Sequence, residues 1–198
     1  AKTKFISVTQ MSNVLGVSPD IKKIIKLSHS HGIPILIDGC QGVVHEKTDV
    51  QDLDCDFYLF SGHKTYGPTG IGVLYAKSEH LEKMRPWRGG GDMIKQVEKE
   101  SIIYNDAPNK FEAGTPNITG AIGLGIALNY FDKKIKEGLF EHEIEISNYL
   151  HSQISSVKDI IIYGEDNIDS PIVTFNVKDQ HPHDISTIID NYGIAIRA

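Results

Sequence analysis

Cysteine is scarce in this sequence, and long apolar runs and blocks of like charge are missing from it. Only two of its 198 residues are cysteines, Cys40 and Cys55, and they form neither a CxxC pair nor a disulfide-like pattern. No stretch reaches the roughly 18 apolar residues of a membrane span, and the first residues lack the pattern of a secretory signal. These absences predict a soluble protein in a reducing compartment, the cytoplasm.

The charge distribution limits the classes of ligand that the protein is expected to bind. The formal net charge is -6, and acidic and basic residues are interleaved along the chain. This pattern argues against a nucleic-acid or anionic-membrane surface, so a small molecule is the expected ligand. Among the nine histidines, His29 and His31 lie at the end of an expected helix, and His181 and His183 lie around a proline. Neither arrangement is typical of a metal site, and we predict none.

The first part of the chain alternates strands and helices. Short β-rich runs are expected at residues 5–10, 34–38, 57–60 and 71–76. A helix is expected from about 19 to 31, with Ser18 as N-cap, Pro19 at the first helical position and Gly32 as terminator. Because the run at 34–38 is almost continuously apolar, it should be buried on both faces. The predicted fold class is therefore α/β, with a mostly parallel sheet and covering helices.

The pattern changes in the second part of the chain. Residues 85–117 lose periodicity, and an excursion of that length indicates a functional or interface segment, here a subunit contact. Helices follow at about 118–131 and 139–157, and then a strand, strand, helix, strand order ends at "GIAIRA". We therefore predict two domains, 1–131 and 132–198, the second a smaller α+β C-terminal subdomain. The chain opens almost on a strand and stops within another, which predicts a segment of a longer protein.

Polar side chains follow two of the predicted strands. Asp38 and Gln41 lie at the end of one strand, and Ser61, His63 and Lys64 at the end of another. In an open parallel sheet, ligands bind beyond the carboxyl ends of the strands. A desolvated lysine there can attack a carbonyl, and a carboxylate can hold a pyridine nitrogen in its protonated form, which together indicate pyridoxal phosphate. From these residues alone, a solvated lysine without a catalytic role is the alternative.

Longer motifs carry a resemblance to a known family. "SNVLG", "DGCQ", "CDFYLFSGHKTYGPTGIGVLY", "GGGDMI" and "FEAGTPN" occur in this order. They closely resemble the cysteine desulfurases of the class V aminotransferase family, in the sulfur-mobilisation branch that also acts on selenocysteine. The resemblance covers nearly the whole chain and implies part of the large domain of a fold-type I pyridoxal phosphate enzyme. It also implies a homodimer that converts L-cysteine to L-alanine and passes persulfide sulfur to an acceptor protein for iron-sulfur cluster assembly.

The resemblance assigns roles at the cofactor. Lys64 matches the catalytic lysine that forms the Schiff base, and Asp38 matches the partner of the pyridinium nitrogen. Gln41 and Asn13 match residues near the phenolic oxygen of the ring and near the substrate. The remaining matches are the phosphate ligands Ser61 and His63, with His63 also a catalytic candidate beside Lys64, the phosphate ligand Thr115 supplied by the other subunit, and Arg197 near the substrate carboxylate.

Two groups of family residues have no counterpart in this chain. A histidine that stacks on the ring and a further phosphate ligand would precede residue 1, and the mobile-loop cysteine that attacks the substrate sulfur would follow Arg197. Cys40 and Cys55 do not align with that cysteine, and we expect both to be small buried hydrophobic residues. The resemblance therefore implies a core segment that does not by itself complete desulfuration.

Two alternatives stay open. Selenocysteine lyase, with L-selenocysteine as substrate, or another class V enzyme would carry the same core motifs. A catalytically silent truncated module for dimer formation or binding belongs to a different class, but it gives no chemical reason for Lys64, Asp38 and Gln41 to occur together.

Overall fold

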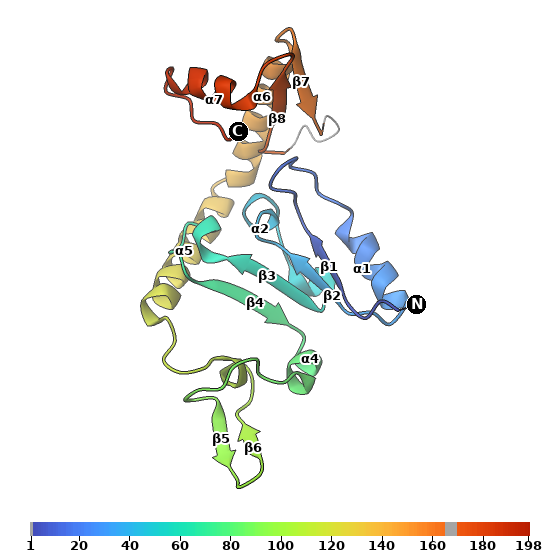
Figure 1. Ribbon diagram of the computed structural model, residues 1–198, viewed down its shortest axis with the longest axis vertical. Helices are drawn as coiled ribbons and strands as arrows, with labels where there is room; N and C mark the ends of the chain where they lie inside the picture. The colour runs from blue at the N-terminus through green and yellow to red at the C-terminus, as the bar shows by residue number, and fades with distance from the viewer. Residues whose placement is uncertain (1, 165–169) are drawn as a thin grey trace. The chain divides into compact units, whose positions relative to one another are not determined.

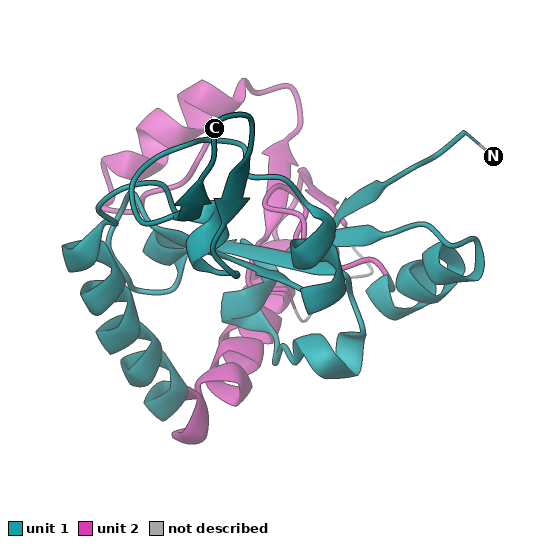
Figure 2. Ribbon diagram, turned by 90° about the horizontal axis from the view of Figure 1, so that it is seen from below, with its two compact units in different colours: residues 1–10, 20–134 teal, residues 11–19, 135–198 magenta. Residues whose placement is uncertain are grey.

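The computed structural model describes residues 2–164 and 170–198 (Figure 1). The chain divides into two compact units (Figure 2). Unit 1 comprises Ala1–Gln10 and Asp20–Lys134, and unit 2 comprises Met11–Pro19 and Ile135–Ala198. Within the described residues, no helix is both long enough and apolar enough to cross a membrane.

A four-stranded sheet forms the centre of unit 1. Its strands are β1 (Ile6–Thr9), β2 (Ile35–Asp38), β3 (Phe57–Ser61) and β4 (Gly72–Ala76), and they lie in that order. β1, β2 and β3 are parallel, whereas β4 runs antiparallel to β3. The predicted α/β fold with a mostly parallel sheet is confirmed. Since three strands point the same way, their carboxyl ends share one edge of the sheet.

Helix α1 (Ile21–Ser30) packs against this sheet, and its N-cap differs from the predicted one. Its apolar residues Ile21 and Ile25 join β2 in the core. Asp20, not Ser18, is the N-cap, because its carboxylate accepts a hydrogen bond from the Lys23 amide at 3.1 Å. Gly32 terminates the helix as predicted. Its φ of +65° lies in the left-handed region, which glycine adopts without a steric clash.

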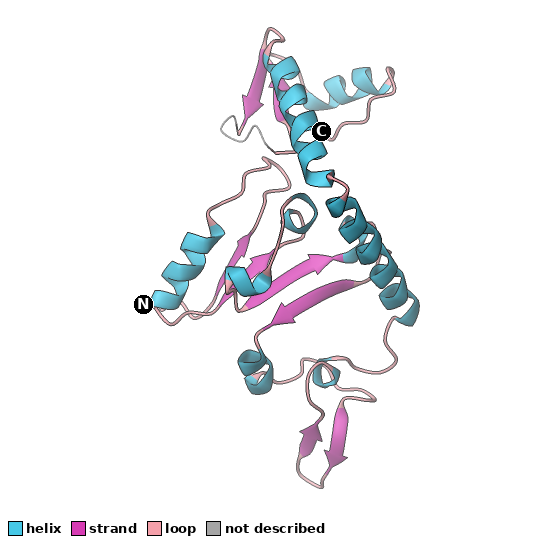
Figure 3. Ribbon diagram, turned by 180° about the vertical axis from the view of Figure 1, so that it is seen from behind, coloured by secondary structure: helices cyan, strands magenta, loops and turns pink. Residues whose placement is uncertain are grey.

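The other elements of unit 1 are short, apart from one long helix. They are α2 (Gly42–His45), α3 (Val50–Leu53), the 3-10 turn η1 (Gly62–Lys64), α4 (Ser78–Lys83), the 3-10 turn η2 (Asn109–Phe111) and α5 (Ile118–Lys136), whose last two residues are assigned to unit 2. The aperiodic stretch 85–117 is mostly loop (Figure 3). It also contains a hairpin that the sequence did not predict, formed by β5 (Ile94–Val97) and β6 (Ile102–Tyr104).

Unit 2 is an α+β arrangement. It contains α6 (Leu139–Ser155), the antiparallel strands β7 (Ile160–Tyr163) and β8 (Thr174–Val177), and α7 (Pro182–Asp190). The predicted final strand at "GIAIRA" is wrong, because the described residues 194–198 have no strand assignment. Ile194 and Ile196 alternate as in a strand, but both are exposed, and a strand needs a neighbour for its backbone hydrogen bonds.

Candidate functional site

The two predicted strand ends are neighbours in the sheet. Asp38 is the last residue of β2 and lies opposite Leu59 of β3, two residues before Ser61 ends that strand. The Gly39 amide donates to the Leu59 carbonyl at 2.9 Å, which extends the pairing past Asp38. The side chains that follow β2 and β3 therefore emerge at the same edge.

A direct contact joins the segments beyond these strands. The Lys64 Nζ atom donates to Gln41 Oε1 at 3.2 Å, and the Gln41 amide nitrogen lies 2.9 Å from His45 Nε2. The structure thus brings Lys64 and Gln41 together, as expected for a shared crevice. His45 was missed from the sequence, although its position four residues after Gln41 puts both side chains on one side of a helical turn.

The backbone around Lys64 is tightly held. Thr65 is fully buried, and both its amide and its hydroxyl donate to the Gly62 carbonyl, at 3.0 and 2.9 Å. Just before this turn, Ser61 Oγ lies 2.7 Å from His63 Nδ1. The pair offers a hydroxyl and an imidazole beside the Lys64 amine, and hydrogen-bond donors of this kind suit an anionic group such as a phosphate.

Cys40 lies within the same edge of the sheet. Its amide donates to Asp38 Oδ1 at 3.0 Å. Burial raises the pKa of the Cys40 thiol, and the hydrogen bond and charge of Asp38 act in the same direction, against smaller opposing effects of Lys64 and the Ser61 backbone. Burial also raises the pKa of the Cys55 thiol, which is fully buried as predicted, whereas Cys40 is only half-buried. Neither thiol has the lowered pKa of an activated nucleophile.

Three predicted residues lie outside these contacts. Thr115 is exposed in the loop between η2 and α5 of unit 1, and the adjacent Gly114 amide donates to the Gly91 carbonyl at 2.9 Å. Asn13 and Arg197 are exposed residues of unit 2. The roles of these three residues therefore stay predictions.

A second polar cluster lies at the opposite, amino-terminal ends of the strands. Asp56, just before β3, accepts hydrogen bonds from His29 and His80, both at 2.9 Å, and from the Ile35 amide at 2.8 Å. Asp56, Glu79 and His80 are close enough together to be considered as metal ligands. The Lys77 ammonium, however, lies 3.7 Å from Asp56 Oδ1 and would repel a cation there. The cluster is best described as a buried carboxylate satisfied by several donors.

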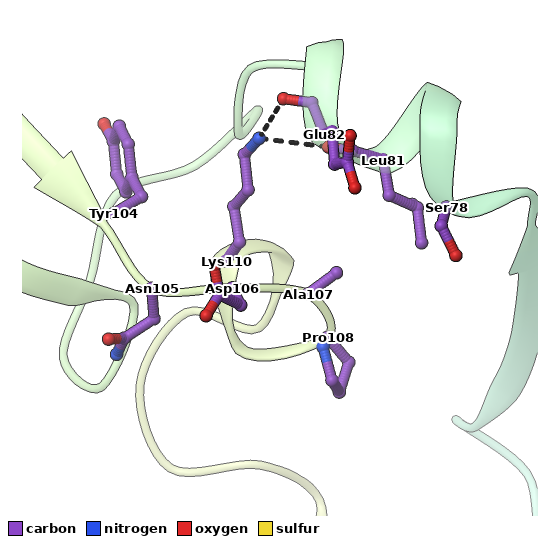
Figure 4. A pocket seen from close by; sticks show the side chains of 9 residues that line it. All are labelled: Ser78, Leu81, Glu82, Tyr104, Asn105, Asp106, Ala107, Pro108 and Lys110. Carbon is purple, nitrogen blue, oxygen red and sulfur yellow. Dashed lines mark hydrogen bonds between the residues drawn. The ribbon is translucent and has the colours of Figure 1, made fainter.

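A cavity of about 670 Å³ lies between α4 and residues 104–110 (Figure 4). Lys110 extends along it and donates to the carbonyls of Leu81 and Glu82 at the end of α4, both at 3.0 Å. This contact satisfies carbonyls that a helix terminus leaves unpaired. The predicted site residues are not among the residues that line this cavity, so its role is separate from the crevice at the strand ends.

The donor set at the carboxyl ends fits pyridoxal phosphate. The Lys64 amine contacts Gln41, which follows Asp38. A group that can bind an aldehyde and a carboxylate therefore lie at the ends of the adjacent strands β3 and β2. The Ser61 and His63 pair adds donors for a phosphate. These side chains supply part of what the cofactor requires of a protein.

Comparison with known proteins agrees with this fold. The family model for class-V aminotransferases matches residues 1–198, and the chain belongs to that family. Cysteine desulfurases from Escherichia coli O157:H7 and Shigella sonnei are 47% and 48% identical to it over 197 residues, or 99% of this chain and 48% of each relative. The chain therefore spans about half the length of the curated relatives it matches.

Solved structures also match nearly the whole of this chain over about half of their own length. The cysteine desulfurase CsdA from Escherichia coli matches with a TM-score of 0.85 and 41% identity, over 98% of this chain and 48% of that one. The cysteine desulfurase from Thermococcus onnurineus NA1, in its apo form, matches with a TM-score of 0.86 and 34% identity, over 98% and 49%. The cystine C-S lyase C-DES, in complex with cysteine persulfide, has a TM-score of 0.87 over 99% and 54%, and at 22% identity it supports the fold alone.

Proposed function

We propose that the whole protein is a pyridoxal phosphate-dependent cysteine desulfurase that converts L-cysteine to L-alanine and releases the sulfur as a persulfide. The contact between Lys64 and Gln41, across the carboxyl ends of β2 and β3, carries the proposal because it places an amine next to the residues that follow Asp38. The identity of 47% to curated cysteine desulfurases supports the substrate.

Each residue has a distinct task in this proposal. When bound, pyridoxal phosphate supplies an aldehyde that condenses with amines and a ring that accepts the electron pair released at the substrate Cα. Lys64 would hold the aldehyde and would move protons at the substrate Cα, with His63 beside it. Asp38 keeps a proton on the ring nitrogen, Gln41 orients Lys64, and Ser61 and His63 donate to the phosphate.

The sulfur-transfer step needs a reactive thiolate. The raised pKa values of Cys40 and Cys55 disfavour both as nucleophiles. We propose that the attacking cysteine is a different residue of the whole protein, as the family resemblance implies.

The remaining parts of the proposal concern partners and location. Asn13 and Arg197 bind the substrate, and a bidentate arginine suits its carboxylate. The protein acts as a homodimer in which Thr115 reaches the phosphate of the partner subunit. The persulfide passes to an acceptor protein for iron-sulfur cluster assembly in the cytoplasm.

Residues 1–131 belong to the large domain of the whole protein, and residues 132–198 belong to its small domain. Two unpaired cysteines support a reducing compartment.

The first test is chemical labelling of the whole protein with pyridoxal phosphate followed by borohydride and peptide mapping. We expect label on Lys64, and a Lys64→Ala variant that binds no cofactor covalently and turns over cysteine at least about 10³-fold more slowly, as for loss of a covalent catalyst. Label scattered over surface lysines, with no turnover of cysteine, would contradict the proposal and favour a silent module. Normal turnover by Lys64→Ala would contradict the role given to Lys64.

The second candidate function, selenocysteine lyase, is separated by substrate. Comparable release of sulfur from cysteine and selenium from selenocysteine supports desulfurase activity. Turnover of selenocysteine alone would assign the lyase.

A further inference from the structure

A buried polar network lies directly beneath the turn that carries Asp38 and Gln41. The Tyr58 hydroxyl donates to Gln10 Oε1 at 2.6 Å, and the Gln10 amide nitrogen donates to Glu46 Oε2 at 3.0 Å and Thr48 Oγ1 at 3.3 Å. Thr48 Oγ1 lies 3.5 Å from the Tyr58 hydroxyl and closes the ring. Gln10 and Tyr58 are each only 3% exposed, so the hydrogen bond between them is shielded from water, whereas the bonds to Glu46 and Thr48 are partly buried. We call these four residues the Gln10–Tyr58 network.

The network touches the turn at two glycines. A Cβ atom on Gly39 would lie 1.9 Å from the Tyr58 hydroxyl, and one on Gly42 would lie 2.4 Å from Cδ of Gln10. Both distances are far below a van der Waals contact. The backbone between Asp38 and α2 therefore rests on the Tyr58 and Gln10 side chains with no room for a side chain between them.

The backbone of the network residues is bonded to β2 and to α2. The Gln10 amide donates to the Asp38 carbonyl at 2.8 Å, and the Glu46 amide donates to the Gly42 carbonyl at 2.8 Å. Tyr58 belongs to β3, where it pairs with Ile37, the residue before Asp38. A shift of the Gln10 side chain would therefore be transmitted to Asp38 on one side and, through α2, to Gln41 on the other.

We propose that Gln10 and Tyr58 are positioning residues that fix the turn from Asp38 to Gly42 and thereby the Asp38 carboxylate and the Gln41 amide. The assignment rests on the proposed function for the roles of Asp38 and Gln41, but the geometry of the network is independent of it. Burial raises the pKa of Tyr58 to about 12, so the phenol stays a hydrogen-bond donor throughout the neutral pH range. A misplacement of about 1 Å in such a turn is large on the scale of catalytic geometry.

The test compares Tyr58→Phe with Tyr75→Phe in the whole protein. Tyr58→Phe keeps the ring against Gly39 and removes only the donor to Gln10. Tyr75 is the cross-strand neighbour of Tyr58 on β4, so Tyr75→Phe removes a hydroxyl from the same sheet and serves as the matched control. The first measurement is hydrogen exchange of backbone amides without cofactor.

In Tyr58→Phe we expect amides 39–46 to exchange about tenfold faster, as for loss of one buried hydrogen bond, with α1 unchanged. After loading with pyridoxal phosphate, its induced visible circular dichroism per bound cofactor should weaken in Tyr58→Phe and not in Tyr75→Phe. An unchanged turn, or exchange raised evenly over the sheet, would overturn the proposal, and so would an unchanged dichroism signal. If the protein binds no pyridoxal phosphate at all, the proposed function fails, while the exchange measurement still tests the network.

Discussion

At the residue scale, Cys40 shows how its surroundings at the carboxyl ends of the strands lower the reactivity of one side chain. The thiol lies beside a carboxylate and is half-buried, and both conditions disfavour the thiolate. Lys64 acts in the opposite direction but does not reverse the shift. A cysteine can therefore lie at the proposed cofactor site and still have a thiol of low reactivity.

We predict that Cys40 alkylates slowly. Because the pKa of its thiol is raised, the reactive thiolate should appear only at higher pH than for an ordinary cysteine. At pH 7 the rate with iodoacetamide should be at least about tenfold below that of a free cysteine. Mass spectrometry of the protein without cofactor would measure it, with the fully buried Cys55 as the control that labels only after unfolding. Fast labelling of Cys40 at neutral pH would contradict a raised pKa of its thiol.

At the element scale, Asp56 connects segments that are distant in sequence. It joins α1 through His29, the start of β2 through the Ile35 amide, and α4 through His80. Burial alone would raise the pKa of this carboxyl group, but hydrogen bonds from His80, His29 and Ile35 outweigh it, so the pKa is lowered. The carboxylate therefore stabilises the fold at neutral pH.

Replacing Asp56 by Asn should lower the free energy of unfolding by about 2–4 kcal/mol at pH 7, because two donors lose a buried charge. Since the folded-state pKa lies below the unfolded value, this stabilisation is complete above the unfolded pKa and is lost as the pH falls through the folded pKa. The difference between variant and parent should therefore shrink below about pH 4. Urea unfolding at several pH values measures both effects.

The control for this prediction is Asp52→Asn. Asp52 pairs with Lys22 at 2.7 Å, but the two side chains are 67% and 61% exposed. Removing an exposed ion pair should change stability by no more than about 0.5 kcal/mol. Equal effects of the two substitutions would mean that Asp56 is no more important than a surface carboxylate.

The same scale shows what the sequence could and could not predict. The strand ends at Asp38 and Ser61 follow from local apolar runs, and their convergence follows from the rule for parallel sheets. The cap at Asp20 was missed because Ser and Asp are equally good N-caps and only the backbone decides between them. Contacts such as Tyr58 with Gln10, or Asp56 with His29, depend on side-chain directions across the sheet and have no periodic signal.

At the scale of the whole molecule, the β5–β6 hairpin bears on the proposed homodimer. Val97 and Ile102 face each other across the hairpin and are 67% and 49% exposed. Exposed apolar residues on a projecting hairpin are typical of an interface. The aperiodic stretch predicted as a subunit contact thus has a surface suited to that role, and the subunit contact stays a prediction.

We predict that Val97→Asp weakens the proposed homodimer of the whole protein, since it would place a charge in the apolar contact proposed for this hairpin. Sedimentation at micromolar concentration should show a dissociation constant raised at least about tenfold, with an unchanged circular dichroism spectrum. Gln96→Asp changes the charge equally at the adjacent exposed residue and should have a smaller effect. A Val97→Asp protein that stays as dimeric as the Gln96→Asp control would place the interface elsewhere.

The close approach of Gly39 to Tyr58 has a consequence for sequence evolution in this family. A Cβ atom at residue 39 would lie only 1.9 Å from the phenol oxygen and 2.0 Å from Cζ of Tyr58, so residue 39 cannot gain a side chain while the Tyr58 ring keeps its place. A relative that carries alanine at the position of Gly39 should carry a smaller, non-aromatic residue at the position of Tyr58. The two columns of an alignment should therefore covary, and the pairing of a small residue with a large one would mark the chains that share this turn.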